Sequence, residues 1–271
     1  FIFLIFALSL KALTTYLQLR FIKVRELTIS KRLIEVYFNQ PYSWFLNHNS
    51  ADLGKTVLSE VSTVVNLGLS PIIILITNSI ITIVLLILLL IVDLKLALIT
   101  GFIFSLFYFI IYNLVRNFLN YIGKETIKAD QMRFKALSEA FGASKEIKLG
   151  GLEKFYIENY TKPARKFSYN QALAKIISQI PRFAVEGIAF GGLLLATLIL
   201  MANSRTFDTV LPIIALYAFA GYRLVPALQQ VYTSFTSLRF VGPALDNLYN
   251  TLQKLENNKF IENKGKLTLK K

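Results

Sequence analysis

The sequence predicts an all-α membrane protein, and three observations lead to this class. Two uncharged runs, residues 72–92 and 96–115, contain 21 and 20 residues, and only a three-residue polar break separates them. A helix of about 20 apolar residues spans the roughly 30 Å hydrocarbon core of a bilayer. The whole chain is 54% hydrophobic and only 17% charged. The alternative is a buried helical hairpin of a large soluble protein, but such helices rarely stay apolar on every face for six turns.

The composition excludes several kinds of site. The chain has no cysteine and a single histidine, His48, so neither a metal site nor a cysteine nucleophile is expected. No group of residues predicts catalysis. The net charge of +14 is compatible with nucleic-acid binding, but in a membrane protein it more often reflects basic cytoplasmic segments. We therefore expect the protein to associate with a membrane and not with nucleic acid.

Hydropathy predicts a transmembrane domain over residues 1–255 with five membrane crossings. The crossings are expected at about 1–22, 72–92, 96–115, 183–202 and 209–232. The chain starts inside an apolar run, without an initiator Met or the basic region of a signal peptide, so a fragment lacking its true N-terminus is expected. Residues 256–271 are polar and lysine-rich, and they are predicted to form a linker.

Long helical extensions are predicted between the crossings. Pro41 ends the first helix, and Ser50 with Asp52 suits the start of a second helix over about 51–92. At about 1.5 Å per residue, only half of that helix fits in the bilayer. The extensions, 20–70 and 116–182, hold 19 Lys and Arg residues, whereas the short loops hold only Lys95 and Arg205. This bias places the extensions in the cytoplasm.

Two breaks between the extensions resemble the intracellular loops of ABC exporters of the six-helix type. These are QPYSWFLNHNSADLGKTVLSEVSTV at 40–64 and ALSEAFGASKEIKLGGLEKFYIENY at 136–160. The family pattern of the second loop is E-x-x-x-G-x-x-x-I-K, and Glu139 lies one residue away from the position of its glutamate. Within this family, the sequence most resembles flippases of lipid-linked oligosaccharides. The similar segments are QPY at 40–42, IKLGGLEKFY at 147–156 and PRF-x-x-E at 181–186. The resemblance implies that the first membrane helix of that family lies outside this sequence. No G-x-x-x-x-G-K-[ST] motif occurs in it, so the nucleotide-binding domain is expected to lie outside it too.

The resemblance implies an ABC type-1 exporter fold, in which short coupling helices at the loop tips dock on a nucleotide-binding domain. That missing domain would bind ATP and Mg. A second copy of the chain, as a homodimer, and an amphiphilic or lipid substrate are the other implied partners, and the bacterial inner membrane is the implied location. The coupling residues expected here are Tyr42, Trp44, Phe45, Leu46, Lys145, Glu146, Ile147 and Leu149. The alternative is that both tips are ordinary helix connections.

Charged groups within the apolar runs form a second set of candidate residues, because an ionisable side chain in the membrane usually faces a cavity. Lys11 lies near the middle of its run, although it can also extend toward an interface. Arg182 and Glu186 are four residues apart and can pair with each other. Arg223 lies deep in the last crossing and suits a lipid phosphate, or else a structural ion pair. These four residues are the predicted substrate path.

The predicted function is ATP-driven movement of an amphiphile, such as a lipid-linked oligosaccharide, by alternating access. ATPase activity is expected only when the chain is joined to a nucleotide-binding domain. Export of peptides or drugs is an alternative within the same class. A secondary transporter or channel is an alternative from another class, and a structural scaffold is disfavoured by the intramembrane charges.

Overall fold

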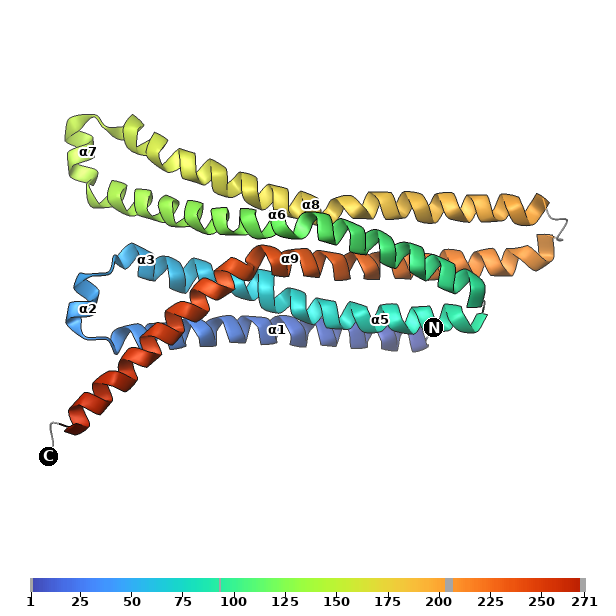
Figure 1. Ribbon diagram of the computed structural model, residues 1–271, viewed down its shortest axis with the longest axis horizontal. Helices are drawn as coiled ribbons and strands as arrows, with labels where there is room; N and C mark the ends of the chain where they lie inside the picture. Colours follow the sequence, from blue (N-terminus) through green and yellow to red (C-terminus); the bar gives the residue numbers. More distant parts are fainter. Residues whose placement is uncertain (1, 93, 203–206, 269–271) are drawn as a thin grey trace. The chain divides into compact units, whose positions relative to one another are not determined.

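The computed structural model describes residues 2–92, 94–202 and 207–268. It is 96% helical and contains no strand among these residues, which confirms the predicted all-α class (Figure 1). The α-helices are α1 (Ile2–Phe38), α2 (Tyr42–Leu46), α3 (Ser50–Lys55), α4 (Val61–Val64), α5 (Ser70–Val92), α6 (Leu94–Gly142), α7 (Ser144–Gly150), α8 (Glu153–Ala202) and α9 (Phe207–Thr268).

The chain divides into two compact units. The first unit comprises residues 1–70, 123–169 and 241–271, and it therefore contains both predicted loop tips. The second unit comprises residues 71–122 and 170–240, with most of the predicted crossings. Helices α6, α8 and α9 each run through both units.

The predicted second helix is continuous from Ser50 to Val92, but it is not a regular α-helix. Two π-helical turns, η1 (Thr56–Glu60) and η2 (Val65–Leu69), interrupt it on either side of α4. The residues flanking these turns keep right-handed helical dihedral angles, so the rod does not break. Each π turn widens the helix locally, because its hydrogen bonds join residues five rather than four apart.

The predicted helix ends agree closely with the structure. Helix α1 continues beyond the first apolar run and ends at Phe38, three residues before Pro41. Helix α6 ends at Gly142, where the sequence predicts the break. Helix α9 differs, because it continues beyond Leu255 to Thr268 where a linker is expected. No proline lies between 256 and 268, and an established helix extends easily through residues of moderate propensity.

Within the described residues, two stretches are long and apolar enough to cross a membrane, Ile5–Phe38 and Asp52–Ile91. They overlap the predicted crossings 1–22 and 72–92 over residues 5–22 and 72–91. The other three predicted crossings lie in α6, α8 and α9, and each includes side chains outside the described set. The five-crossing topology therefore stays a prediction.

Candidate functional site

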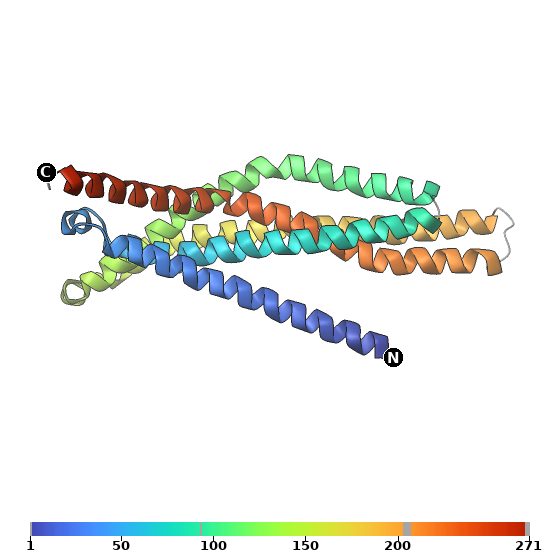
Figure 2. The same cartoon turned by 90° about the horizontal axis from the view of Figure 1, so that it is seen from below.

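Two short helices lie at the same end of the first unit, and both views show this (Figures 1 and 2). Helix α2 joins α1 to α3, and α7 joins α6 to α8. Their positions match the two loop tips that the sequence predicts at 42–49 and 143–150. Each tip is therefore a short helix between two longer helical segments.

Helix α2 presents two large apolar side chains to solvent. Tyr42 is 78% exposed and Leu46 is 69% exposed. Because they are four residues apart, they lie on one face of the helix. Pro41 precedes this helix in an extended conformation, with φ −64° and ψ 155°, and turns the chain away from α1. This face is suited to contact with a partner.

The other aromatic residues of this tip pack within the first unit. The ring of Trp44 stacks on Tyr37 at the end of α1, with centroids 5.6 Å apart. On the same tip, the Trp44 ring lies 3.8 Å from the His48 ring, and His48 Nδ1 is 2.8 Å from the Trp44 carbonyl oxygen. Phe45 meets Trp44 edge-on at 5.2 Å. Trp44 and Phe45 are half-buried, and Trp44 holds α2 in place.

Helix α7 divides its predicted coupling residues in the same way. Lys145, Glu146 and Leu149 are exposed, and Leu149 is 79% exposed. Ile147 is only 7% exposed. Its side chain is covered by the first unit, so Ile147 fixes α7 and is not available as a surface anchor.

The end of α7 is set by Gly151, whose φ of +63° lies in the left-handed region that favours glycine. The amides of Gly151 and Leu152 both donate to the Ile147 carbonyl. Lys148 pairs with Glu153 at 3.0 Å, at the start of α8. The pKa of Glu153 is lowered by a hydrogen bond from its own backbone amide and by Lys148. These contacts define the turn between α7 and α8.

Behind the tips, polar contacts join helices of the first unit. Asp130 on α6 accepts a hydrogen bond from Ser59 at 3.1 Å and pairs with Arg133 at 2.5 Å. The Arg133 guanidinium lies 4.1 Å from the ring centroid of Phe167 on α8. Sequence analysis missed these contacts. Asp130 and Arg133 are three residues apart on α6, but Ser59 and Phe167 lie on other helical segments and only the tertiary fold brings them to this pair.

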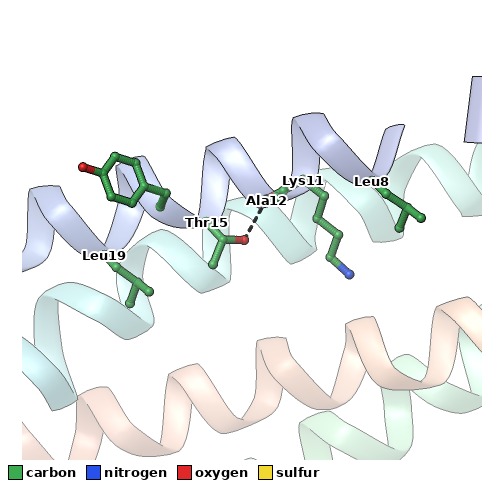
Figure 3. A pocket seen from close by; sticks show the side chains of 6 residues that line it. Leu8, Lys11, Ala12, Thr15 and Leu19 are labelled. Carbon is green, nitrogen blue, oxygen red and sulfur yellow. Dashed lines mark hydrogen bonds between the residues drawn. The ribbon is translucent and has the colours of Figure 1, made fainter. Parts of the chain in front are cut away.

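The predicted substrate-path residues fall in both units, with Lys11 in the first and the other three in the second. Lys11 is exposed on α1, where a shallow depression of about 540 Å³ is lined by α1 residues (Figure 3). Figure 3 shows Lys11, Thr15 and Leu19 directed to the same side of that helix. Arg182 pairs with Glu186 at 2.7 Å, as the alternative interpretation expects. Arg223 is exposed, and no acidic partner for it occurs among the described residues.

A buried polar cluster in the second unit was not predicted. Pro181 on α8 lacks the amide that would bond to the Ile177 carbonyl, and the Tyr232 hydroxyl lies 3.5 Å from that oxygen. Gln229, also on α9, donates to the Ser178 carbonyl at 2.7 Å. Pro181 within a helical pattern is the sequence feature that could have pointed to such substitute donors.

Long helices joined in pairs by short helices with exposed apolar side chains agree with the expected membrane component of a transporter. The family model for the ABC transporter transmembrane region matches residues 1–222, which is most of the chain. The chain therefore belongs to this family. It is an integral membrane protein of the ABC exporter class, and the family implies association with a nucleotide-binding domain. A secondary transporter or channel is not supported.

Proposed function

We propose that this chain is the transmembrane part of an ATP-driven flippase for a lipid-linked oligosaccharide in the bacterial inner membrane, working as a homodimer. The substrate class is supported by the resemblance of the segments 40–42, 147–156 and 181–186 to the sequences of such flippases. ATP and Mg belong to the nucleotide-binding domain, and this chain contributes no catalytic group. Its task is to turn closure of those domains into alternate opening of a cavity.

The single observation that carries the proposal is the pair of exposed short helices at one end of the first unit. Tyr42 and Leu46 on α2, and Leu149 on α7, are large apolar groups held outward by packed neighbours. Such side chains are suited to fill pockets on a partner surface. Docked in this way, α2 and α7 follow the movement of the nucleotide-binding domains and transmit it to α1, α3, α6 and α8.

Arg223 is the residue that best suits the anionic head group of such a substrate. Its guanidinium is exposed and is not engaged by an acid among the described residues. A guanidinium forms two parallel hydrogen bonds to a phosphate, which a lipid pyrophosphate offers. An arginine that faced lipid hydrocarbon would cost about 2.5 kcal/mol or more, so it is expected to face protein or water.

The test is a transport assay with the protein and its nucleotide-binding domain reconstituted in vesicles. A fluorescent lipid-linked oligosaccharide is expected to change leaflet only with ATP and Mg. A peptide substrate and a cationic dye serve as competing candidates in the same vesicles. ATP-dependent movement of either one, without movement of the lipid, would replace the flippase proposal with export of peptides or drugs.

A further inference from the structure

Lys55 and Glu60 form a buried ion pair at a spacing that an α-helix does not allow. Their charged atoms are 2.6 Å apart, and the side chains are only 4% and 5% exposed. In an α-helix, residues five apart point about 140° away from each other. Here the π turn Thr56–Glu60 lies between them, and a π turn brings residues five apart onto one face. The ion pair and the π turn therefore depend on each other.

A third side chain completes this arrangement from another helix. Asn247 on α9 donates to both carboxylate oxygens of Glu60, at 3.2 and 3.0 Å. A buried carboxylate is costly unless its oxygens are hydrogen-bonded and its charge is paired. Lys55 pairs with the charge of Glu60, and Asn247 donates hydrogen bonds to its oxygens. We call Lys55, Glu60 and Asn247 the clasp.

The same π turn is attached on a second side. Ser59 donates to Asp130 on α6 at 3.1 Å. Earlier in the chain, Gln40 donates to the Leu255 carbonyl of α9 at 3.4 Å. All of these residues belong to the first unit. The segment that carries α2 and α3 is thus tied to α9 both at the π turn and at the end of α1.

We propose that the clasp holds the π turn and thereby sets the direction in which α2 faces. A π turn holds one residue more than an α turn. If η1 became α-helical, the residues before it would rotate by about 100° and shift by about 1.5 Å relative to α5. Tyr42 and Leu46 would then face elsewhere. Lys55, Glu60 and Asn247 are in this sense positioning residues for the exposed face of α2.

A consequence for coupling follows, and it rests on the proposed docking of α2. Because Asn247 lies on α9, a movement of α9 relative to the π turn would break the two hydrogen bonds from Asn247 to Glu60. The direction of α2 then depends on the position of α9 as well as on the bound partner. The clasp thus connects α2 to α9 within one subunit.

The experiment measures the position of α2 without any nucleotide-binding partner. Because the chain has no cysteine, spin labels can be attached to cysteines at Leu46 on α2 and Tyr249 on α9, both exposed. Pulsed electron resonance in the purified membrane protein gives the distance distribution between them. Lys55→Met and Glu60→Gln each remove the ion pair with little change in volume, and deletion of Leu58 removes the extra residue of the π turn.

We expect both substitutions to displace the mean distance. The deletion should leave the distance near that of the parent, because an α turn with one residue fewer keeps the residues before it on the same face. Lys31→Met, which removes the exposed Lys31–Glu35 pair of α1, is the matched control and should leave the distance unchanged. The exchanged pair Lys55→Glu with Glu60→Lys should move the distance back toward the parent value, because the ion pair is kept while the two hydrogen bonds from Asn247 to the carboxylate are lost. Distances equal to the parent in both single variants would overturn the proposal, as would single variants that fail to fold and are not rescued by the exchanged pair.

ATPase stimulation measured separately distinguishes this inference from the proposed function. A displaced α2 with normal ATPase stimulation would support the proposed role of the clasp and contradict the docking role of α2. An unchanged α2 with a loss of stimulation would contradict the clasp alone.

Discussion

The indole ring of Trp44 lies against the imidazole of His48, with centroids 3.8 Å apart and planes 19° from parallel. Tyr37 covers the same indole at 5.6 Å. Trp44 is therefore a structural residue of the α1–α2 turn, although its type suggests a docking anchor. The exposed large apolar side chains of this tip are its neighbours Tyr42 and Leu46, which are the proposed docking residues.

This division predicts two different phenotypes on α2. Leu46→Ala should reduce substrate-stimulated ATPase activity of the complete transporter and leave its melting temperature unchanged, because an exposed anchor contributes about 2 kcal/mol only at the interface. Trp44→Ala should lower the melting temperature as well, since each aromatic contact contributes about 0.5–1.5 kcal/mol. Leu27→Ala on α1, at an equally exposed leucine, is the control. Normal stimulation with Leu46→Ala would show that α2 does not dock.

Gly151 offers a test of the α7 turn. Gly151→Ala should destabilise the protein by about 1–2 kcal/mol, because alanine is strained at a φ of +63°. Gly142→Ala is the control, since a Cβ there meets nothing within 4 Å and its φ is not positive. Thermal unfolding followed by fluorescence compares the two variants. Equal melting temperatures would mean that alanine at position 151 is not strained.

The pair between Glu125 and Lys166 predicts a pH dependence in the first unit. Lys166 on α8 lies 2.5 Å from this carboxylate, and this hydrogen bond, together with Lys128, lowers the pKa of Glu125 below its ordinary 4.5. A lowered pKa means that the folded state binds fewer protons, so the contribution to stability is complete above 4.5 and is lost as pH falls through the folded-state pKa.

Glu125→Gln should therefore lower the melting temperature slightly near neutral pH, and the difference from the parent should shrink as the pH falls below the ordinary pKa of 4.5 and through the lowered pKa of Glu125. The effect is small because the pair is largely solvated. Exposed Glu158, which has no ion-pair partner among the described residues, is the control position for the same substitution. A difference that grows on acidification would reverse the assigned sign.

The charge distribution predicts the topology. Cysteines introduced at 95 and 205 should react with an impermeant maleimide in intact cells, whereas cysteines at His48 and Lys148 should react only after permeabilisation. The chain has no cysteine of its own to interfere. The Lys95 side chain and residue 205 lie outside the described residues, so labelling is the direct measurement. Reaction at 148 in intact cells would invert the orientation.

Arg223 predicts a substrate phenotype. Arg223→Ala should reduce transport of a lipid pyrophosphate by about tenfold or more, because a hydrogen bond to a charged group contributes about 1.5–3 kcal/mol. Arg223→Lys should restore part of it, since the charge remains and the two-pronged contact is lost. Basal ATPase activity and expression should stay near normal, and Arg116→Ala, at another exposed arginine of the second unit, is the control. Full transport by Arg223→Ala would remove the residue from the path.

The helices and their breaks could be predicted because the responsible features are local. Uncharged runs, Pro41 and Gly142 act within a few residues, and they identified both short helices. The division of each tip into buried and exposed residues could not be predicted. Ile147 and Leu149 are both aliphatic, and only the surrounding helices decide that one is covered while the other faces solvent.

The polar contacts between helices were beyond the sequence for a related reason. Glu60 and Asn247 are 187 residues apart, and nothing in their local surroundings connects them. Lys55 and Glu60 are close in sequence, but a regular helix places them on different faces. Assuming ideal α-helical geometry thus concealed the pair, whereas Arg182 and Glu186 follow the regular spacing and were recognised as a pair.

The two π turns also affect how this chain should be compared with its relatives. A relative whose corresponding helix is regular has one residue fewer at each turn, so a correct alignment requires single-residue gaps close to positions 58 and 67. Without those gaps, the faces assigned to α3 and α5 would differ by about 200° of accumulated rotation. Lipid-facing and core positions would then be exchanged between otherwise equivalent helices. A π turn thus absorbs an insertion of one residue in this helix, and the residues on either side of it keep their faces.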